Sequence, residues 1–162
     1  MRVVLCVLLL VGGCRASLPL EPRWRPLVEV VERPGLGSAD PGVTTLGTRV
    51  YVRDLDAFAK RYPAGTPERE ALLSHEREHA RRQLALGLGS WLARYLSDAG
   101  FMWREEQVGW GLELRLLRES GRSPRPEAVA LALSRYRNLS GRMVGYSQAL
   151  AWVRDVLRGR AP

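Results

Sequence analysis

The spacing of hydrophobic and polar residues divides the chain into a short β-rich part followed by a series of helices. Residues 27–31 and 43–53 are rich in β-branched side chains, which predicts one strand and then a strand or hairpin that turns at Gly47. Later segments repeat apolar residues at helical spacing between Gly and Pro breaks. We expect these helices over residues 67–86, 90–96, 103–118, 123–136 and 148–157. The fold class predicted is α+β, predominantly helical, with one domain over residues 27–162.

The helix predicted over residues 67–86 has two distinct faces. Thr66 is expected to cap it, and Pro67 occupies its first position. A broad face predicted to be buried carries Leu72, His75, Glu76, His79, Ala80, Gln83 and Leu86. The opposite side carries Arg77, Glu78, Arg81 and Arg82, and Glu78 is expected to pair with Arg82 four residues later. Like Thr66, Ser147 is expected to cap a helix, in this case the last one, over residues 148–157.

The first residues have the composition of a leader. Arg2 precedes an apolar run over residues 3–11, which is too short to span a bilayer. The run ends in Val11-Gly12-Gly13-Cys14, which resembles the lipobox of bacterial lipoproteins. The resemblance implies a signal peptide over residues 1–13, a lipid anchor on Cys14 and a tether over residues 14–26. Cleavage near Ala16, with ordinary secretion, is the alternative, and both versions export the protein to the cell envelope.

Charge and cysteine content restrict the partners and the metal chemistry. The net charge is +8 and comes almost entirely from arginines that are scattered along the chain. This pattern favours anionic lipid or cell-wall polymer over nucleic acid, and we expect no nucleic-acid partner. Cys6 would be removed with the leader, so no disulfide forms in the mature domain. A metal site would therefore use histidine, carboxylate and water.

The segment His75-Glu76-Arg77-Glu78-His79 has the HExxH pattern and contains both histidines of the chain. Residues four apart share one helical face, so His75 and His79 can bind one Zn²⁺ ion. Glu76 is then placed to accept a proton from a zinc-bound water that attacks a peptide carbonyl. The charged pair Arg77-Glu78 departs from the usual zinc peptidases, whose two central positions are uncharged. A catalytic zinc takes three protein ligands, so one more is required.

The helix over residues 103–118 offers two candidates for the third ligand. Glu106 lies at the border of an apolar stripe that includes Trp103 and Trp110, whereas Glu105 points into a second stripe. Burying an unpaired carboxylate is costly, so we expect at least one of the two to contact a metal or an arginine such as Arg104.

An HExxH helix followed by a glutamate on a second helix resembles the gluzincin division of zinc metallopeptidases. The segment LGTRVYVR at 46–53, Gln83 and the segment WLARYL at 91–96 are similar in order to small bacterial members, so the resemblance covers residues 43–118. Those relatives carry a Glu-x-Glu-Ala-Tyr motif, which Glu106 to Trp110 matches best. The resemblance implies a minimal zincin-like domain with a small sheet or hairpin beside the HExxH helix and Glu106 as third ligand, with Glu105 as the alternative.

The resemblance also implies a group that stabilises the oxyanion. Larger gluzincins use a histidine or tyrosine, and no histidine is left here, so Tyr95, Tyr136, Tyr146 or an arginine would serve. The function predicted is that of an exported, lipid-anchored zinc peptidase with peptide or protein substrates in the cell envelope. The alternative is a non-catalytic envelope lipoprotein that uses the same scaffold to bind a protein or peptidoglycan.

Overall fold

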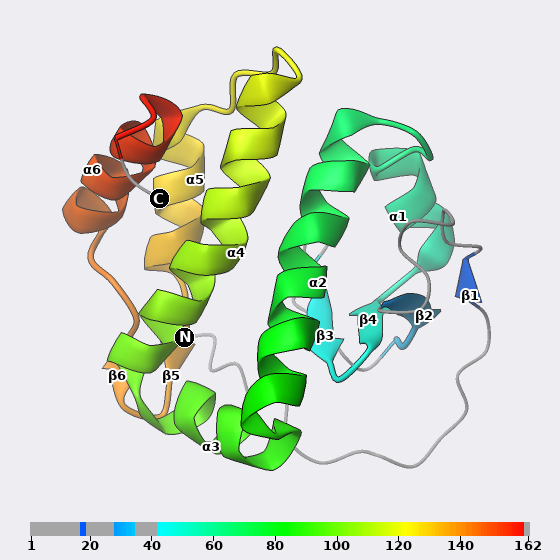
Figure 1. Cartoon of the computed structure of the whole chain (residues 1–162), viewed down its shortest axis with the longest axis horizontal. Helices are drawn as coiled ribbons and strands as arrows, with labels where there is room; N and C mark the ends of the chain where they lie inside the picture. Colours follow the sequence, from blue (N-terminus) through cyan, green and yellow to red (C-terminus); the bar gives the residue numbers. More distant parts are fainter. Residues whose placement is uncertain (1–16, 19–27, 35–41, 161–162) are drawn as a thin grey trace.

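The fold is α+β and predominantly helical, as the sequence predicts. The computed structural model describes residues 17–18, 28–34 and 42–160. The predicted leader, the lipobox with Cys14 and most of the predicted tether lie outside these residues. Figure 1 shows a small sheet with helices α1 and α2 on one side of the molecule and helices α4 to α6 on the other. Helices α2 and α4 meet between these two parts.

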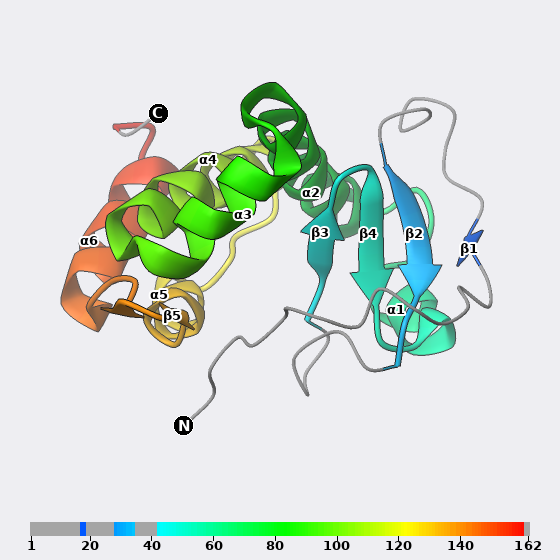
Figure 2. The same cartoon turned by 90° about the horizontal axis from the view of Figure 1, so that it is seen from below.

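The sheet is built from four short strands. They are β1 (Ser17–Leu18), β2 (Glu29–Glu32), β3 (Thr44–Leu46) and β4 (Arg49–Val52), in the spatial order β1-β2-β4-β3. β2 and β4 are parallel, whereas β1 pairs with β2 and β3 pairs with β4 in antiparallel fashion. The predicted strand and hairpin are both confirmed, and the hairpin turns at Gly47, whose φ of +59° suits glycine. β3 is an edge strand and lies beside α2 (Figure 2).

Two helices connect to this sheet. α1 (Leu55–Arg61), which the apolar spacing did not predict, is capped by Asp54, whose carboxylate accepts a hydrogen bond from the Ala57 amide. α2 (Pro67–Leu86) agrees with the predicted range, and the Thr66 hydroxyl accepts from the Arg69 amide at 3.3 Å. Their apolar faces and the inner face of the sheet form the first hydrophobic core. Its buried residues are Val28, Val30, Val50, Val52, Leu55, Phe58, Leu72, Leu73 and Ala80.

The remaining elements surround a second core. They are α3 (Leu88–Ser97), α4 (Ala99–Glu119), α5 (Pro126–Ser134), β5 (Arg137–Asn138), β6 (Gly141–Arg142) and α6 (Tyr146–Leu157). α4 begins four residues before the predicted start because Asp98 caps it and accepts from the Phe101 amide at 2.9 Å. The expected cap at Ser147 is wrong, since Gly145 holds that position and Ser147 lies inside α6.

The buried residues of the second core come mainly from α4, α5 and α6. They are Met102, Leu114, Val129, Ala130, Leu133, Met143, Val144, Ala149, Val153 and Val156. Because α2 belongs to the first core and α4 to the second, side chains between these two helices are enclosed from both sides. Among the described residues, no helix combines the length and the apolar character that a membrane span requires.

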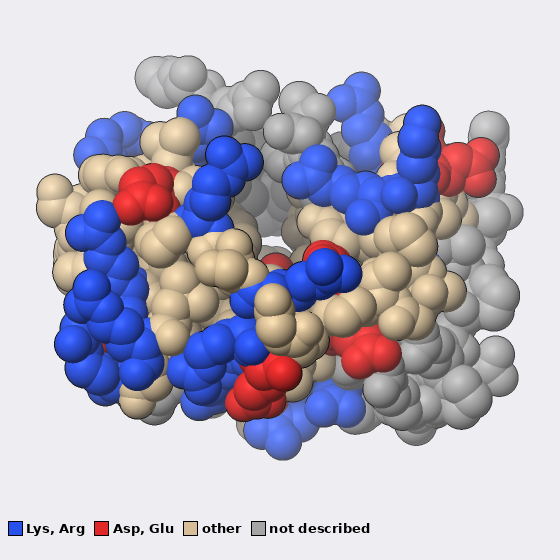
Figure 3. Space-filling view, turned by 90° about the horizontal axis from the view of Figure 1, so that it is seen from above, with Lys and Arg blue, Asp and Glu red and all other residues tan. Residues whose placement is uncertain are grey.

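Basic side chains predominate on the surface. Figure 3 views the molecule from the top of Figure 1, and Lys and Arg cover much more of that face than Asp and Glu do. The same view shows a hollow between the part with the sheet and the part with α4 to α6. This arrangement is consistent with the net charge of +8.

Candidate metal centre

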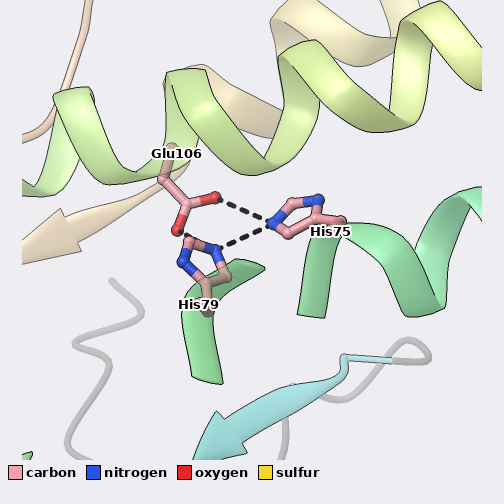
Figure 4. A group of neighbouring side chains, drawn as sticks. All are labelled: His75, His79 and Glu106. Atoms are coloured by element: carbon pink, nitrogen blue, oxygen red, sulfur yellow. Dashed lines mark hydrogen bonds and ion pairs between the residues drawn. The ribbon is translucent and has the colours of Figure 1, made fainter. Parts of the chain in front are cut away.

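Three side chains that can bind a metal converge between α2 and α4. Nε2 of His75 lies 2.9 Å from Nε2 of His79. The Glu106 carboxylate lies 3.5 Å from Nε2 of His79 and 3.9 Å from Nε2 of His75. Figure 4 shows the two imidazoles projecting from neighbouring turns of α2 toward the carboxylate from α4. All three side chains are buried, and together they can hold a metal ion.

The spacing of these atoms suits a small tetrahedral cation. Ligand atoms bound to zinc at 2.0–2.1 Å in tetrahedral geometry lie roughly 3.3 Å apart. The two imidazole nitrogens are 2.9 Å apart, and each lies 3.5 or 3.9 Å from a different oxygen of the Glu106 carboxylate. One donor atom from each of the three residues lies within 4.8 Å of the other two. The donor set of two imidazole nitrogens and one carboxylate oxygen is also that of a three-ligand zinc site. The predicted ligands His75, His79 and Glu106 are therefore brought together.

His75 is oriented by a carboxylate on its other side. Its Nδ1 lies 2.8 Å from Oε2 of Glu113, which is well placed to accept the Nδ1–H hydrogen bond and so leave Nε2 for a metal. Burial alone would lower the pKa of His75. The hydrogen bond to Glu113 and the charges of Glu76 and Glu106 instead raise that pKa to about 9 in the metal-free protein.

His79 has no comparable support. Burial lowers its pKa to about 4, despite the opposing charge of Glu106, so this ring is neutral at pH 7. Its Nε2 lies within hydrogen-bond distance of Nε2 of His75, at 2.9 Å. Nδ1 of His79 is buried without a hydrogen-bond partner among the described residues.

A glycine permits the close approach of α4 to the metal centre. A Cβ atom added at Gly109 would lie 2.4 Å from Cδ2 and 2.5 Å from Nε2 of His75. These distances are shorter than any that real Cβ atoms make. Position 109 must therefore lack a side chain if His75 is to keep its orientation.

Glu105 and Glu106 have different partners, which separates the two candidates for the third ligand. The fully buried Glu105 accepts hydrogen bonds from Nε and Nη2 of Arg82 at 2.7 and 2.6 Å, and from the Trp91 indole at 2.9 Å. Its carboxylate is thus neutralised by an arginine, whereas that of Glu106 faces the histidines. The expected pair between Glu78 and Arg82 is wrong, because Glu78 binds Arg81 instead, at 3.1 Å.

Glu76 is held by the edge strand of the sheet. Its Oε2 accepts a hydrogen bond of 2.6 Å from the hydroxyl of Thr45 on β3, and the side chain is buried. One helical turn beyond His79, the Gln83 amide binds the same strand, through the Thr45 carbonyl at 2.9 Å and the Gly47 amide at 2.7 Å. The predicted buried face of α2 is therefore confirmed as far as Gln83. Leu86, also predicted on that face, is instead 44% exposed.

The three candidate tyrosines occupy different places. The Tyr95 hydroxyl donates a 2.5 Å hydrogen bond to Oε1 of Glu106, so it supports the carboxylate of the metal centre. Burial together with the charges of Glu106 and Glu76 raises the pKa of Tyr136 well above its usual range. Tyr146 is exposed at the start of α6, and no contact joins it to the metal centre within the described part of the chain.

Three residues of the site were missed by reasoning from the sequence alone: Glu113, Thr45 and the close-packing role of Gly109. Glu113 follows Glu106 by seven residues, a spacing that places both on one face of a helix, so this signal was present. Nothing in the local sequence indicates that Thr45 bonds Glu76 or that Gly109 meets His75, because both contacts depend on how separate elements pack.

Comparison with models of protein families, with curated proteins and with solved structures finds no match to this chain.

Proposed function

We propose that the protein is a zinc-dependent peptidase of the gluzincin type, exported to the cell envelope. The observation that carries this proposal is the convergence of His75, His79 and Glu106, with Glu76 buried one residue after the first ligand. The HExxH pattern and the distal glutamate on a second helix support the family. The leader and the lipobox support export and a lipid anchor on Cys14.

A bound zinc ion would supply Lewis acidity, which lowers the pKa of water and polarises a carbonyl group. Within the chain, His75, His79 and Glu106 would hold the ion, and Glu113 and Tyr95 would orient two of these ligands through the hydrogen bonds at 2.8 and 2.5 Å. Glu76 would accept a proton from the attacking water and deliver it to the leaving amine. Thr45 would keep the Glu76 carboxylate aligned for both transfers.

Of the tyrosines, Tyr136 is the best-placed candidate to donate a hydrogen bond to the oxyanion. Burial and the charges of Glu106 and Glu76 raise the pKa of the Tyr136 phenol, and the side chain of Trp110 opposes that rise. Tyr95 already donates to Glu106, and Tyr146 is exposed at the start of α6. A neutral phenol is required for this role, and the raised pKa keeps Tyr136 protonated at neutral pH.

The proposal is tested by hydrolysis of peptide libraries and cell-wall peptides with the zinc-loaded full chain. Glu76→Gln should retain zinc and lose about 10²–10⁴-fold in rate. Glu78→Gln is the matched control, because it removes a carboxylate of the same motif that forms a surface hydrogen bond with Arg81. Equal loss in both variants would contradict the role of Glu76. A zinc-loaded protein that cleaves no peptide would instead favour the non-catalytic binding scaffold.

A further inference from the structure

The connection between α2 and α3 exposes a continuous apolar segment. All seven residues from 84 to 90 are exposed, in the sequence LALGLGS. Leu84 is 56%, Leu86 44% and Leu88 42% exposed. This segment, here called the leucine corner (residues 84–90), forms the turn at the bottom of Figure 1 and faces the viewer in Figure 2.

The leucine corner differs from the other exposed apolar residues of the described chain. Val108, Leu131, Leu139 and Tyr146 are each exposed singly, on different elements. Isolated exposed side chains of this kind are normal on protein surfaces, whereas several neighbouring ones mark an interaction site. The corner is a protruding turn between two helices, a shape that suits insertion into the apolar region of a lipid bilayer.

Charges around the corner favour an anionic partner. Residues 79–97 contain three arginines and no aspartate or glutamate. Arg81 and Arg94 are exposed, while Arg82 binds the buried Glu105. The acidic groups nearest in the chain are engaged, because Glu78 binds Arg81 and Asp98 caps α4. The whole chain also carries a net charge of +8.

We propose that the leucine corner inserts into the interface of an anionic lipid bilayer. Leucines would enter the boundary between headgroups and acyl chains, and the exposed Arg94 would contact a lipid phosphate. Arg81 would do so by exchanging its surface pair with Glu78 for a phosphate. A convex apolar turn next to basic residues, with no carboxylate in the same stretch, matches the chemistry of such an interface. This contact is separate from any lipid on Cys14, and it does not depend on peptidase activity.

Insertion would bring the metal centre close to the membrane. His79 precedes Leu86 by seven residues on α2, which corresponds to about 10 Å along the helix. A docked molecule would therefore hold His79 just above the headgroups. On the basis of the proposed peptidase function, substrates would be reached at the membrane surface, for example in membrane-proximal segments of other proteins.

The test is hydrogen exchange of the full chain with and without vesicles. A local readout is required because the apolar residues 3–11 can also bind lipid. Vesicles of equimolar phosphatidylglycerol and phosphatidylcholine should slow exchange in residues 84–90 by about tenfold, and pure phosphatidylcholine should slow it less. The triple variant Leu84→Ser, Leu86→Ser, Leu88→Ser should lose this protection. The control Leu131→Ser, Leu139→Ser, which alters exposed leucines elsewhere, should keep it.

Three results would overturn the proposal. One is unchanged exchange at residues 84–90 when the protein is bound to anionic vesicles. Another is protection that persists in the triple variant, because the leucines would then not be the inserting groups. The third is protection that appears without vesicles and grows with protein concentration, which would assign the corner to contact with a second copy of the chain.

Discussion

The carboxylate of Glu113 lies 2.8 Å from Nδ1 of His75, on the side of the ring opposite the metal centre. A carboxylate in this position fixes the tautomer of a ligand histidine and makes its other nitrogen a better donor. Glu113→Ala should therefore weaken zinc binding about 10–100-fold, as measured by competition with a chromophoric chelator. Glu119→Ala, which changes an exposed glutamate at the end of the same helix, should leave the affinity unchanged. Equal affinities of Glu113→Ala and wild type would show that His75 needs no such support.

Gly109→Ala should disrupt the metal centre through overpacking. The added methyl group would overlap the His75 ring, which is fixed on α2 and bound to Glu113. We expect a loss of about 1–3 kcal/mol in the free energy of unfolding, together with reduced zinc affinity. Gly89→Ala is the matched control, because nothing lies within 4 Å of its Cβ position in α3. That control should be neutral or more stable, by about 0.5–1 kcal/mol.

Substitutions of the two adjacent glutamates should have opposite effects. Glu106→Gln should lose zinc and keep most of its stability in the metal-free state. Glu105→Gln should keep zinc but lose about 3 kcal/mol of stability, because the Arg82 guanidinium would lack its counter-charge. Zinc content and urea unfolding in chelator measure the two properties separately. If Glu105→Gln lost zinc while Glu106→Gln retained it, the ligand assignment would have to be exchanged.

The pair of Glu105 and Arg82 should also make the metal-free protein sensitive to acid. Burial tends to raise the pKa of Glu105, but the hydrogen bonds from Arg82 and Trp91 hold it below its usual value. A pKa that is lower in the folded state stabilises the fold above the unfolded value of about 4.3, and this contribution disappears as the pH falls through the folded pKa. Urea unfolding in chelator between about pH 3 and pH 6 should therefore show a steeper loss of stability in wild type than in the double variant Arg82→Leu, Glu105→Leu. If the stability of the two proteins fell with pH along parallel curves, the pair of Glu105 and Arg82 would not be the source of the acid sensitivity.

The sequence predicts elements whose signals are local. Thr66 and Pro67 define the start of α2, and the β-branched residues on both sides of Gly47 predict a strand or hairpin, because caps and turns depend on residues a few positions apart. The start of α4 and the cap of α6 were misplaced, because Asp98 caps α4 and Gly145 holds the cap position that Ser147 was expected to fill. Helix α1 was not predicted, since its seven residues are too few for a clear periodicity.

The residues of the candidate metal centre also differ in whether their role follows from local sequence or from the packing of separate elements. His75, Glu76 and His79 follow from spacing on one helix, and Glu106 was the preferred third ligand. The choice between Glu105 and Glu106, however, depends on where Arg82 and Trp91 lie after α2, α3 and α4 pack. The same packing determines the contacts of Thr45 and Gly109, which no local pattern specifies. Glu113 differs, because its spacing of seven residues from Glu106 places both on one face of α4.

The zinc content of the purified full chain tests the central claim most directly. After dialysis against excess zinc and then against metal-free buffer, elemental analysis should find about one zinc per wild-type chain. His79→Ala should contain none while its circular dichroism spectrum stays that of the wild type. A wild-type protein without zinc, or a His79→Ala variant with as much zinc as wild type, would contradict the assignment of this site.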